Sequence, residues 1–193
     1  VDKMIEVIDS QAGPFMLFAI SMQNHGPFWG NRYQQNEVTL SNDVSDWLRG
    51  EVESFFTGVL DADRQLDRLL EYLESREEPI VCLFFGDHQP AFAARLYGEM
   101  GMAKEGSASL LQQAEVPGLL WANRMELLKP DIMPARFSPS YLPPILLQQM
   151  GIPLPDHFAY LQKGLAETPV LHREFVCDSG GSLSRFERKH SSP

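Results

Sequence analysis

Residues 80–90 read IVCLFFGDHQP, in which six apolar residues are followed at once by a glycine, an aspartate and a histidine. A continuous apolar run of this length, introduced by Pro79 and stopped by Gly86, is typical of a strand that is buried on both faces. In open α/β sheets, ligands bind beyond the carboxyl ends of the strands, and a glycine there allows the chain to turn sharply. We therefore predict that Asp87 and His88 lie in a binding crevice at the end of this strand.

The surrounding residues predict further strands and helices. Residues 15–22 (FMLFAISM) form a second apolar run, and the apolar residues within 59–73 recur with helical spacing opposite a charged face. Two buried strands joined by a helix need a crossover connection, which makes them parallel. A shorter strand is expected at 118–122 and a helix at 140–150. The predicted fold class is α/β, with a mostly parallel central sheet flanked by helices.

Length and composition describe one globular domain with a polar end. The chain has 193 residues, of which 44% are hydrophobic and 22% charged, so it can form a core. We assign residues 1–176 to this domain and the Gly/Ser-rich residues 177–193 to a flexible polar tail. The start at Val1, without an initiator Met and directly before a short helical pattern, is expected to be a cut inside a longer protein.

Charge and cysteine content exclude several kinds of protein. The net charge of −10 repels phosphate backbones, and Lys and Arg are scattered, so nucleic acid is not expected as a partner. No apolar run reaches the roughly 18 residues that a membrane helix needs. Cys82 and Cys177 have no paired spacing, which argues against both a disulfide framework and a zinc-thiolate site.

A second polar loop, SMQNHGPF at residues 21–28, follows the first apolar run. Because the ends of parallel strands meet at one sheet edge, His25 is expected to share a site with Asp87 and His88. A carboxylate and a neutral imidazole suit a divalent ion such as manganese or zinc, although further ligands are then needed. Two simpler interpretations stay open: Asp87 caps the next helix while His88 is a loop residue, or His25 is a turn histidine bonded to backbone.

An ordered set of segments carries a resemblance to a known family. The segments are the run ending in Asn-His-Gly-Pro-Phe, the helix with Asp61 and Asp63, the run ending in Gly-Asp-His, and residues 116–121 and 138–151. In this order they resemble the C-terminal half of the sulfatase-type domain of lipoteichoic acid synthases, within the alkaline phosphatase superfamily. The resemblance runs over about residues 1–165 and implies a partial alkaline-phosphatase-like sandwich.

The resemblance implies roles for three residues. Asp87 and His88 match the pair that binds a single divalent ion, manganese or magnesium, and His25 matches a histidine that contacts the phosphoglycerol group. The family's glutamate ligand and threonine nucleophile have no match here and are expected upstream, so no catalytic nucleophile is assigned within this chain. Residues 121–123 (WAN), where some superfamily members place further ligands, favour one metal ion over two.

The implied activity is metal-dependent phosphoglycerol transfer from a phosphatidylglycerol-type lipid, through a covalent intermediate, to a glycan or lipid acceptor. The alternatives are a sulfatase or phosphoethanolamine transferase of the same superfamily, and a non-catalytic pseudoenzyme or binding domain. Family members usually carry N-terminal membrane helices, which implies a bacterial cell-membrane protein whose catalytic domain lies outside the cytoplasm, in the periplasm or the extracellular space. The present residues alone are expected to be inactive.

Four other residues receive weaker predictions. Trp29 could line a substrate groove, although local packing is the commoner role of such an aromatic. His157 and His172 match no ligand of the family and are expected to be structural or surface residues. Asn123 follows the strand at 118–122 and is expected at the same sheet edge as the site, where it could support the metal ligands indirectly.

Overall fold

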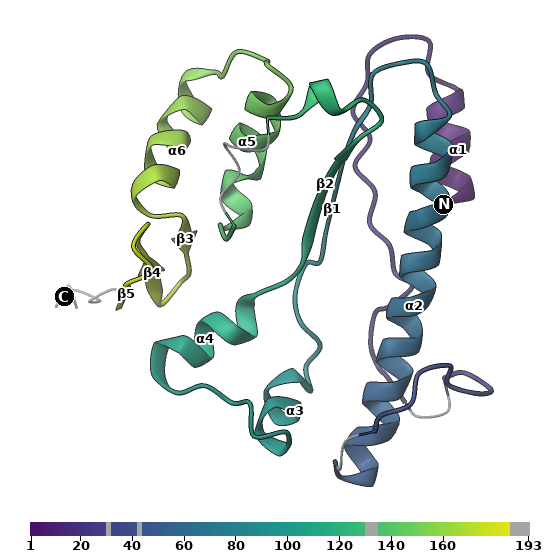
Figure 1. Cartoon of the computed structure of the whole chain (residues 1–193), viewed down its shortest axis with the longest axis vertical. Helices are drawn as coiled ribbons and strands as arrows, with labels where there is room; N and C mark the ends of the chain where they lie inside the picture. Colours follow the sequence, from purple (N-terminus) through teal and green to yellow (C-terminus); the bar gives the residue numbers. More distant parts are fainter. Residues whose placement is uncertain (30–31, 42–43, 130–134, 186–193) are drawn as a thin grey trace, which may run out of the picture. The chain divides into compact units, whose positions relative to one another are not determined.

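The computed structural model describes residues 1–29, 32–41, 44–129 and 135–185 (Figure 1). The chain divides into two compact units. Unit 1 comprises Val1–Glu78 and Gly86–Ala103, and unit 2 comprises Pro79–Phe85 and Lys104–Pro193. The fold is mixed α/β, as the sequence predicts, and each unit has its own set of helices.

Unit 1 is built around one long helix, α2 (Asp46–Glu74), with the shorter helices α1 (Asp2–Asp9) and α3 (Ala93–Glu99). The helical spacing within residues 59–73 thus lies inside α2, which begins thirteen residues earlier than that pattern. Its start is held by the Glu99 carboxylate, which accepts the Ser45 backbone N–H at 2.7 Å and the Ser45 hydroxyl at 2.9 Å. These bonds satisfy donors at a helix N-terminus that would otherwise have no partner.

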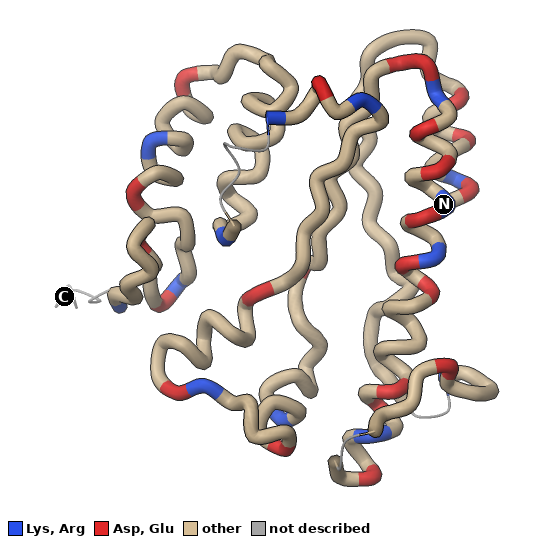
Figure 2. The backbone as a smooth tube through the Cα atoms, viewed as in Figure 1, with Lys and Arg blue, Asp and Glu red and all other residues tan. Residues whose placement is uncertain are grey.

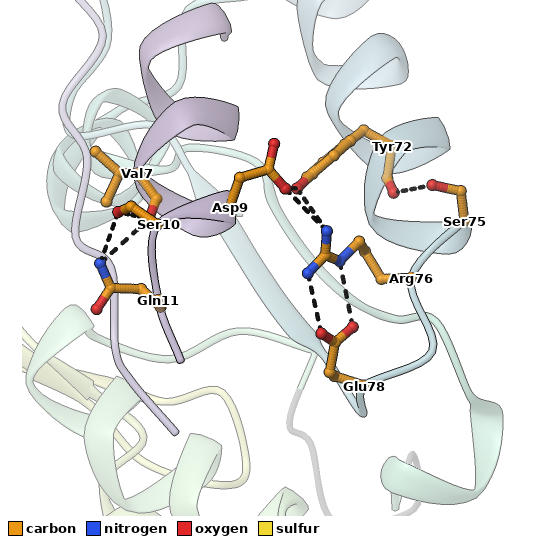
Figure 3. A network of polar contacts seen from close by, with 8 residues as sticks. All are labelled: Val7, Asp9, Ser10, Gln11, Tyr72, Ser75, Arg76 and Glu78. Carbon is orange, nitrogen blue, oxygen red and sulfur yellow. Dashed lines mark hydrogen bonds and ion pairs between the residues drawn. The ribbon is translucent and has the colours of Figure 1, made fainter. Parts of the chain in front are cut away.

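Polar contacts fasten α1 to the C-terminal half of α2 (Figure 3). Asp9 accepts hydrogen bonds from the Tyr72 hydroxyl at 2.6 Å and from Arg76 at 2.8 Å, and Arg76 also pairs with Glu78. Burial, followed by the bond to Asp9, raises the pKa of Tyr72. An ion pair between Asp2 and Arg68 joins the same two helices further along and lowers the pKa of Asp2.

The strand predicted at residues 15–22 is not formed. This segment has no regular secondary structure, and its side chains are exposed, with Met16 at 86% and Ile20 at 74%. A strand is stable when a neighbour pairs with its backbone N–H and C=O groups, and no strand among the described residues pairs with this segment. The expectation of a parallel sheet fails with it, because the described sheets are antiparallel.

Unit 2 contains the other two predicted strands. β1 (Val81–Phe85) pairs with β2 (Gly118–Ala122), with Val81 opposite Ala122 and Phe85 opposite Gly118. Both strands are free of charged residues (Figure 2). Burial raises the pKa of the Cys82 thiol on β1. Helix α4 (Gly106–Ala114) precedes β2, and the 3₁₀ turn η1 (Met125–Leu127) follows it.

The antiparallel pairing corrects the prediction for Asn123. Its side-chain oxygen accepts the Ile80 backbone N–H at 2.9 Å, and its own backbone N–H donates to the Ile80 carbonyl at 3.2 Å. Asn123 therefore lies beside the start of β1, whereas Asp87 and His88 follow the end of that strand. The expectation that Asn123 follows its strand at the same sheet edge as Asp87 and His88 is therefore wrong, and its observed role is to anchor the two-stranded sheet.

The rest of unit 2 is a helical pair followed by a small sheet. The predicted helix at 140–150 is present as the 3₁₀ turn η3 (Pro139–Tyr141) leading into α5 (Leu142–Gln149), and α6 (Asp156–Glu167) packs against it around Tyr141, Ile145 and Leu165. Three short antiparallel strands complete the unit: β3 (Val170–Leu171), β4 (Phe175–Cys177) and β5 (Leu183–Arg185).

The polar tail predicted at 177–193 begins inside this sheet. Cys177 is a buried residue of β4, and residues 183–185 form β5. The remaining residues of that tail, 186–193, lie outside the described residues. In the described ranges, no helix combines the length and the apolar character that crossing a membrane requires.

Candidate metal-binding and substrate-binding site

Asp87 and His88 lie in the loop that follows β1 and present a carboxylate oxygen and an imidazole nitrogen side by side. Asp87 Oδ1 accepts the backbone N–H of His88 at 2.8 Å, while Asp87 Oδ2 lies 3.7 Å from His88 Nε2. His88 Nδ1 lies 2.8 Å from the carbonyl oxygen of Gln89, which can only accept a hydrogen bond. The neutral imidazole therefore carries its proton on Nδ1 and leaves the Nε2 lone pair free.

The local geometry excludes the helix-cap interpretation of Asp87. The N-cap position of α3 is Phe92, and no side-chain hydrogen bond caps this helix. Asp87 instead bonds to its own neighbour, and both side chains reach solvent, with Asp87 83% and His88 71% exposed. The pair is thus available to bind a ligand.

The two donor atoms fit a divalent ion. Two ligands bonded to one ion at about 2.0–2.2 Å can lie up to about 4 Å apart, and the separation of 3.7 Å between Oδ2 and Nε2 meets this limit. The bond from Nδ1 to a backbone carbonyl is the arrangement that commonly orients a metal-binding histidine. Within the described ranges, no cluster of three or more His, Cys, Asp or Glu side chains that could hold a metal ion is present.

His25 has the same local arrangement as His88. Its Nδ1 lies 2.8 Å from the carbonyl oxygen of Gly26, which leaves Nε2 free on an exposed ring. The prediction of a backbone-bonded turn histidine is therefore confirmed, and it is compatible with a role in substrate binding. In the described part of the chain, no hydrogen bond or ion pair joins His25 to Asp87 or His88.

An aromatic cluster connects the two histidine-bearing loops. Phe28, three residues after His25, and Phe92, four residues after His88, both contact Phe55 on α2, with ring centroids 5.2 and 5.5 Å apart. The rings of Phe28 and Phe92 are themselves 5.8 Å apart, and all three pairs meet edge to face. The loops that carry His25 and Asp87-His88 therefore share one anchor within unit 1. The sequence signals this cluster only weakly, by a phenylalanine shortly after each motif.

The other candidates lie away from this cluster or at the surface. Trp29 follows the His25 loop and is 66% exposed. His172 stacks on the ring of Phe175, with centroids 4.6 Å apart, and His157 is an exposed residue of α6 beside Phe158. Both histidines lie in unit 2.

Comparison with known proteins identifies the family. The family model described as Sulfatase matches residues 1–152, which include His25, Asp87 and His88. The chain belongs to the sulfatase family. The predicted resemblance is therefore confirmed at the level of this family, and use of a divalent ion is a general property of such proteins.

A relative of this sulfatase-family chain occurs in Rhizobium meliloti (strain 1021), where the protein is named "Putative cyclic beta-1,2-glucan modification protein". The two are 27% identical over 186 residues, which is 93% of this chain and 28% of the relative. The chain thus spans less than a third of the length of that relative. No solved structure matches it.

Proposed function

We propose that this sulfatase-family chain is part of a metal-dependent transferase that moves phosphoglycerol from a phosphatidylglycerol-type lipid to a hydroxyl group of a glucan. The observation that carries the proposal is the Asp87-His88 pair, with Oδ2 and Nε2 3.7 Å apart and Nδ1 bonded to backbone. The lipid donor is inferred from the resemblance of the ordered motifs to lipoteichoic acid synthases. The glucan acceptor is inferred from the name of the Rhizobium relative.

The three matched residues have separate tasks in this proposal. Asp87 supplies a negative charge and His88 a neutral nitrogen for one divalent ion, manganese or magnesium. When bound, such an ion offsets the charge that develops on phosphoryl oxygens. His25, whose Nε2 is free, contacts the phosphoglycerol group and exchanges a proton with one of its oxygens. The attacking group is assigned to a residue outside the 193 residues of this sequence.

The proposed substrates also define a location. A phospholipid donor requires the active site to work at a membrane surface, and we propose the outer side of the bacterial cytoplasmic membrane. This location is inferred from the same resemblance as the donor.

Turnover by the full-length protein tests the proposal. The protein is incubated with Mn²⁺, labelled phosphatidylglycerol and cyclic β-1,2-glucan, and both diacylglycerol release and label on the glucan are measured. Asp87→Asn and His88→Gln should each lower the transfer rate by at least about 100-fold and weaken Mn²⁺ binding, because each removes a metal-binding group.

The chain offers a matched control in Asp156 and His157, an adjacent Asp-His pair that is also exposed and lies outside the matched residues 1–152. Asp156→Asn and His157→Gln should leave transfer and Mn²⁺ binding unchanged. Unchanged Mn²⁺ binding in Asp87→Asn and His88→Gln would refute the metal assignment. Release of sulfate from a sulfate ester, without diacylglycerol release from phosphatidylglycerol, would replace the proposed transferase with a sulfatase.

A further inference from the structure

The turn that presents His25 is held by the side chain of Arg32. Nη1 of Arg32 donates to the carbonyl oxygen of His25 at 2.8 Å, and Nη2 donates to that of Gln23 at 2.5 Å. These two carbonyl groups flank Asn24, so one planar guanidinium group spans the turn. A planar group with two fixed donors sets the relative orientation of both acceptors, which a flexible single donor cannot do.

Aromatic rings hold the guanidinium group in place. The Arg32 guanidinium carbon lies 5.8 Å from the ring centroid of Phe28 and 5.8 Å from that of Tyr33. Both distances fall within the range of a cation–π contact. Because Phe28 belongs to the aromatic cluster on α2, Arg32 connects the His25 turn to the anchor that the two loops share.

The other side of the turn rests on α2. The side chain of Asn24 packs against Gly58, and the buried oxygens Asn24 Oδ1 and Tyr33 Oη both lie close to the space that a Cβ of Gly58 would occupy. The turn is thus held in two ways: Arg32 binds the carbonyl groups of Gln23 and His25, and Asn24 packs against α2. His25 itself remains exposed.

We propose that Arg32 is a positioning residue that fixes the orientation of the His25 imidazole through the backbone. Arg32 binds the carbonyl oxygen of His25, which belongs to the peptide group between His25 and Gly26. Rotation of this peptide group would break that bond and would also move Gly26. The Gly26 carbonyl oxygen would then no longer hold His25 Nδ1. Loss of Arg32 therefore frees both the ring and its tautomer. The inference rests on the proposed function only for what His25 does to the substrate.

The first test is chemical modification of His25 in the full-length protein, which needs no activity. The rate at which diethylpyrocarbonate modifies His25 is followed by peptide mass spectrometry. Arg32→Gln should lower this rate, since Nδ1 loses its fixed partner and the ring no longer keeps its reactive Nε2 lone pair free. Arg32→Lys should also lower it, because a single ammonium group cannot replace the planar two-donor contact. Arg64→Gln is the matched control, since Arg64 makes a similar two-pronged contact, to the Glu37 carboxylate.

The second test is a double-mutant cycle on turnover. Arg32→Gln should lower kcat about 10- to 100-fold with little change in KM, because a small misplacement of a reacting group has an effect of this size. In a His25→Gln background, Arg32→Gln should cause no additional loss, as expected for a residue that acts through His25.

The outcomes separate this inference from the proposed function. An unchanged His25 modification rate in folded Arg32→Gln and Arg32→Lys proteins would overturn the positioning role. If the losses of kcat in Arg32→Gln and His25→Gln multiply in the double variant, the positioning role is also overturned, because Arg32 would then act on the substrate directly and not through His25. A His25 modification rate that Arg32→Gln lowers, in a protein that does not turn over phosphatidylglycerol, would support the positioning role and refute the proposed function.

Discussion

Gly58 is the position at which one added methyl group most directly tests how the His25 turn is seated. Gly58 is buried in the interior of α2. A Cβ at this position would lie 2.2 Å from Asn24 Oδ1, 2.9 Å from Asn24 Cγ and 3.1 Å from Tyr33 Oη. The two separations from Asn24 are shorter than real Cβ contacts, so Gly58→Ala must displace the Asn24 side chain.

Two opposing effects determine the stability of the Gly58→Ala variant. Alanine is favoured over glycine inside a helix by about 0.8–1.0 kcal/mol. Inserting a methyl group into a filled site costs about 1–3 kcal/mol. The expected net change in unfolding free energy therefore lies between about zero and a loss of 2 kcal/mol. Turnover should fall by about 10-fold or more, because Asn24 directly precedes His25 in the turn.

The midpoint of thermal unfolding and the transfer rate of the full-length protein measure these two effects. Gly98→Ala is the matched control, because Gly98 lies in α3 and a Cβ added there would meet open space. Gly98→Ala should therefore stabilise the protein and leave its activity unchanged. In an Asn24→Ala background the clash is largely removed, and Gly58→Ala should then be stabilising. If Gly58→Ala alone raises the unfolding midpoint and keeps full turnover, Asn24 does not rest on Gly58 and the reasoning is refuted.

Two further predictions concern the packing and ionisation of unit 1. Phe92→Ala should lower the unfolding free energy by about 3–5 kcal/mol, since Phe92 is 7% exposed and contacts two rings. Phe56 is 39% exposed, so Phe56→Ala should lower the unfolding free energy by less than half as much. Equal costs in denaturant unfolding would contradict the role of the cluster. The Ser45 backbone N–H, together with the Ser45 hydroxyl, lowers the pKa of Glu99. A lowered carboxyl pKa contributes stability above the ordinary value of about 4.3 and loses it as the pH falls through the folded-state pKa. Glu99→Gln should therefore destabilise the protein at neutral pH, and the difference in unfolding midpoint from wild type should shrink below about pH 4. A difference in unfolding midpoint that does not change with pH would argue against this contact.

Local patterns in the sequence predict the individual elements better than their pairing. Helical spacing inside α2 and the apolar run of β1 depend on neighbouring residues, so both are recognisable from sequence. The direction of strand pairing depends on which chain segment lies alongside. The apolar run at residues 15–22 looks like that of β1, yet none of the strands in the described part of the chain pairs with it, and β1 pairs antiparallel with β2 instead.

The same distinction applies to the candidate site. Asp87, His88 and His25 are recognisable because each follows an apolar run directly. Arg32 belongs to an irregular segment, and its contacts with Gln23 and His25 span nine and seven positions without any period. Such a contact depends on how a loop folds back on itself, which no spacing rule describes.

His25 and His88 share one consequence of bonding Nδ1 to the carbonyl oxygen of the next residue. In free histidine, the proton exchanges between two nitrogens and the ring rotates. Here both freedoms are restricted when the chain folds, before any ligand arrives. A cation that binds His88 Nε2 would therefore meet a lone pair that is already free, and less entropy would be lost on binding than with a mobile ring. Preorganisation of this kind comes from a bond between two residues adjacent in sequence, and at His25 the backbone that makes this bond is itself held by Arg32.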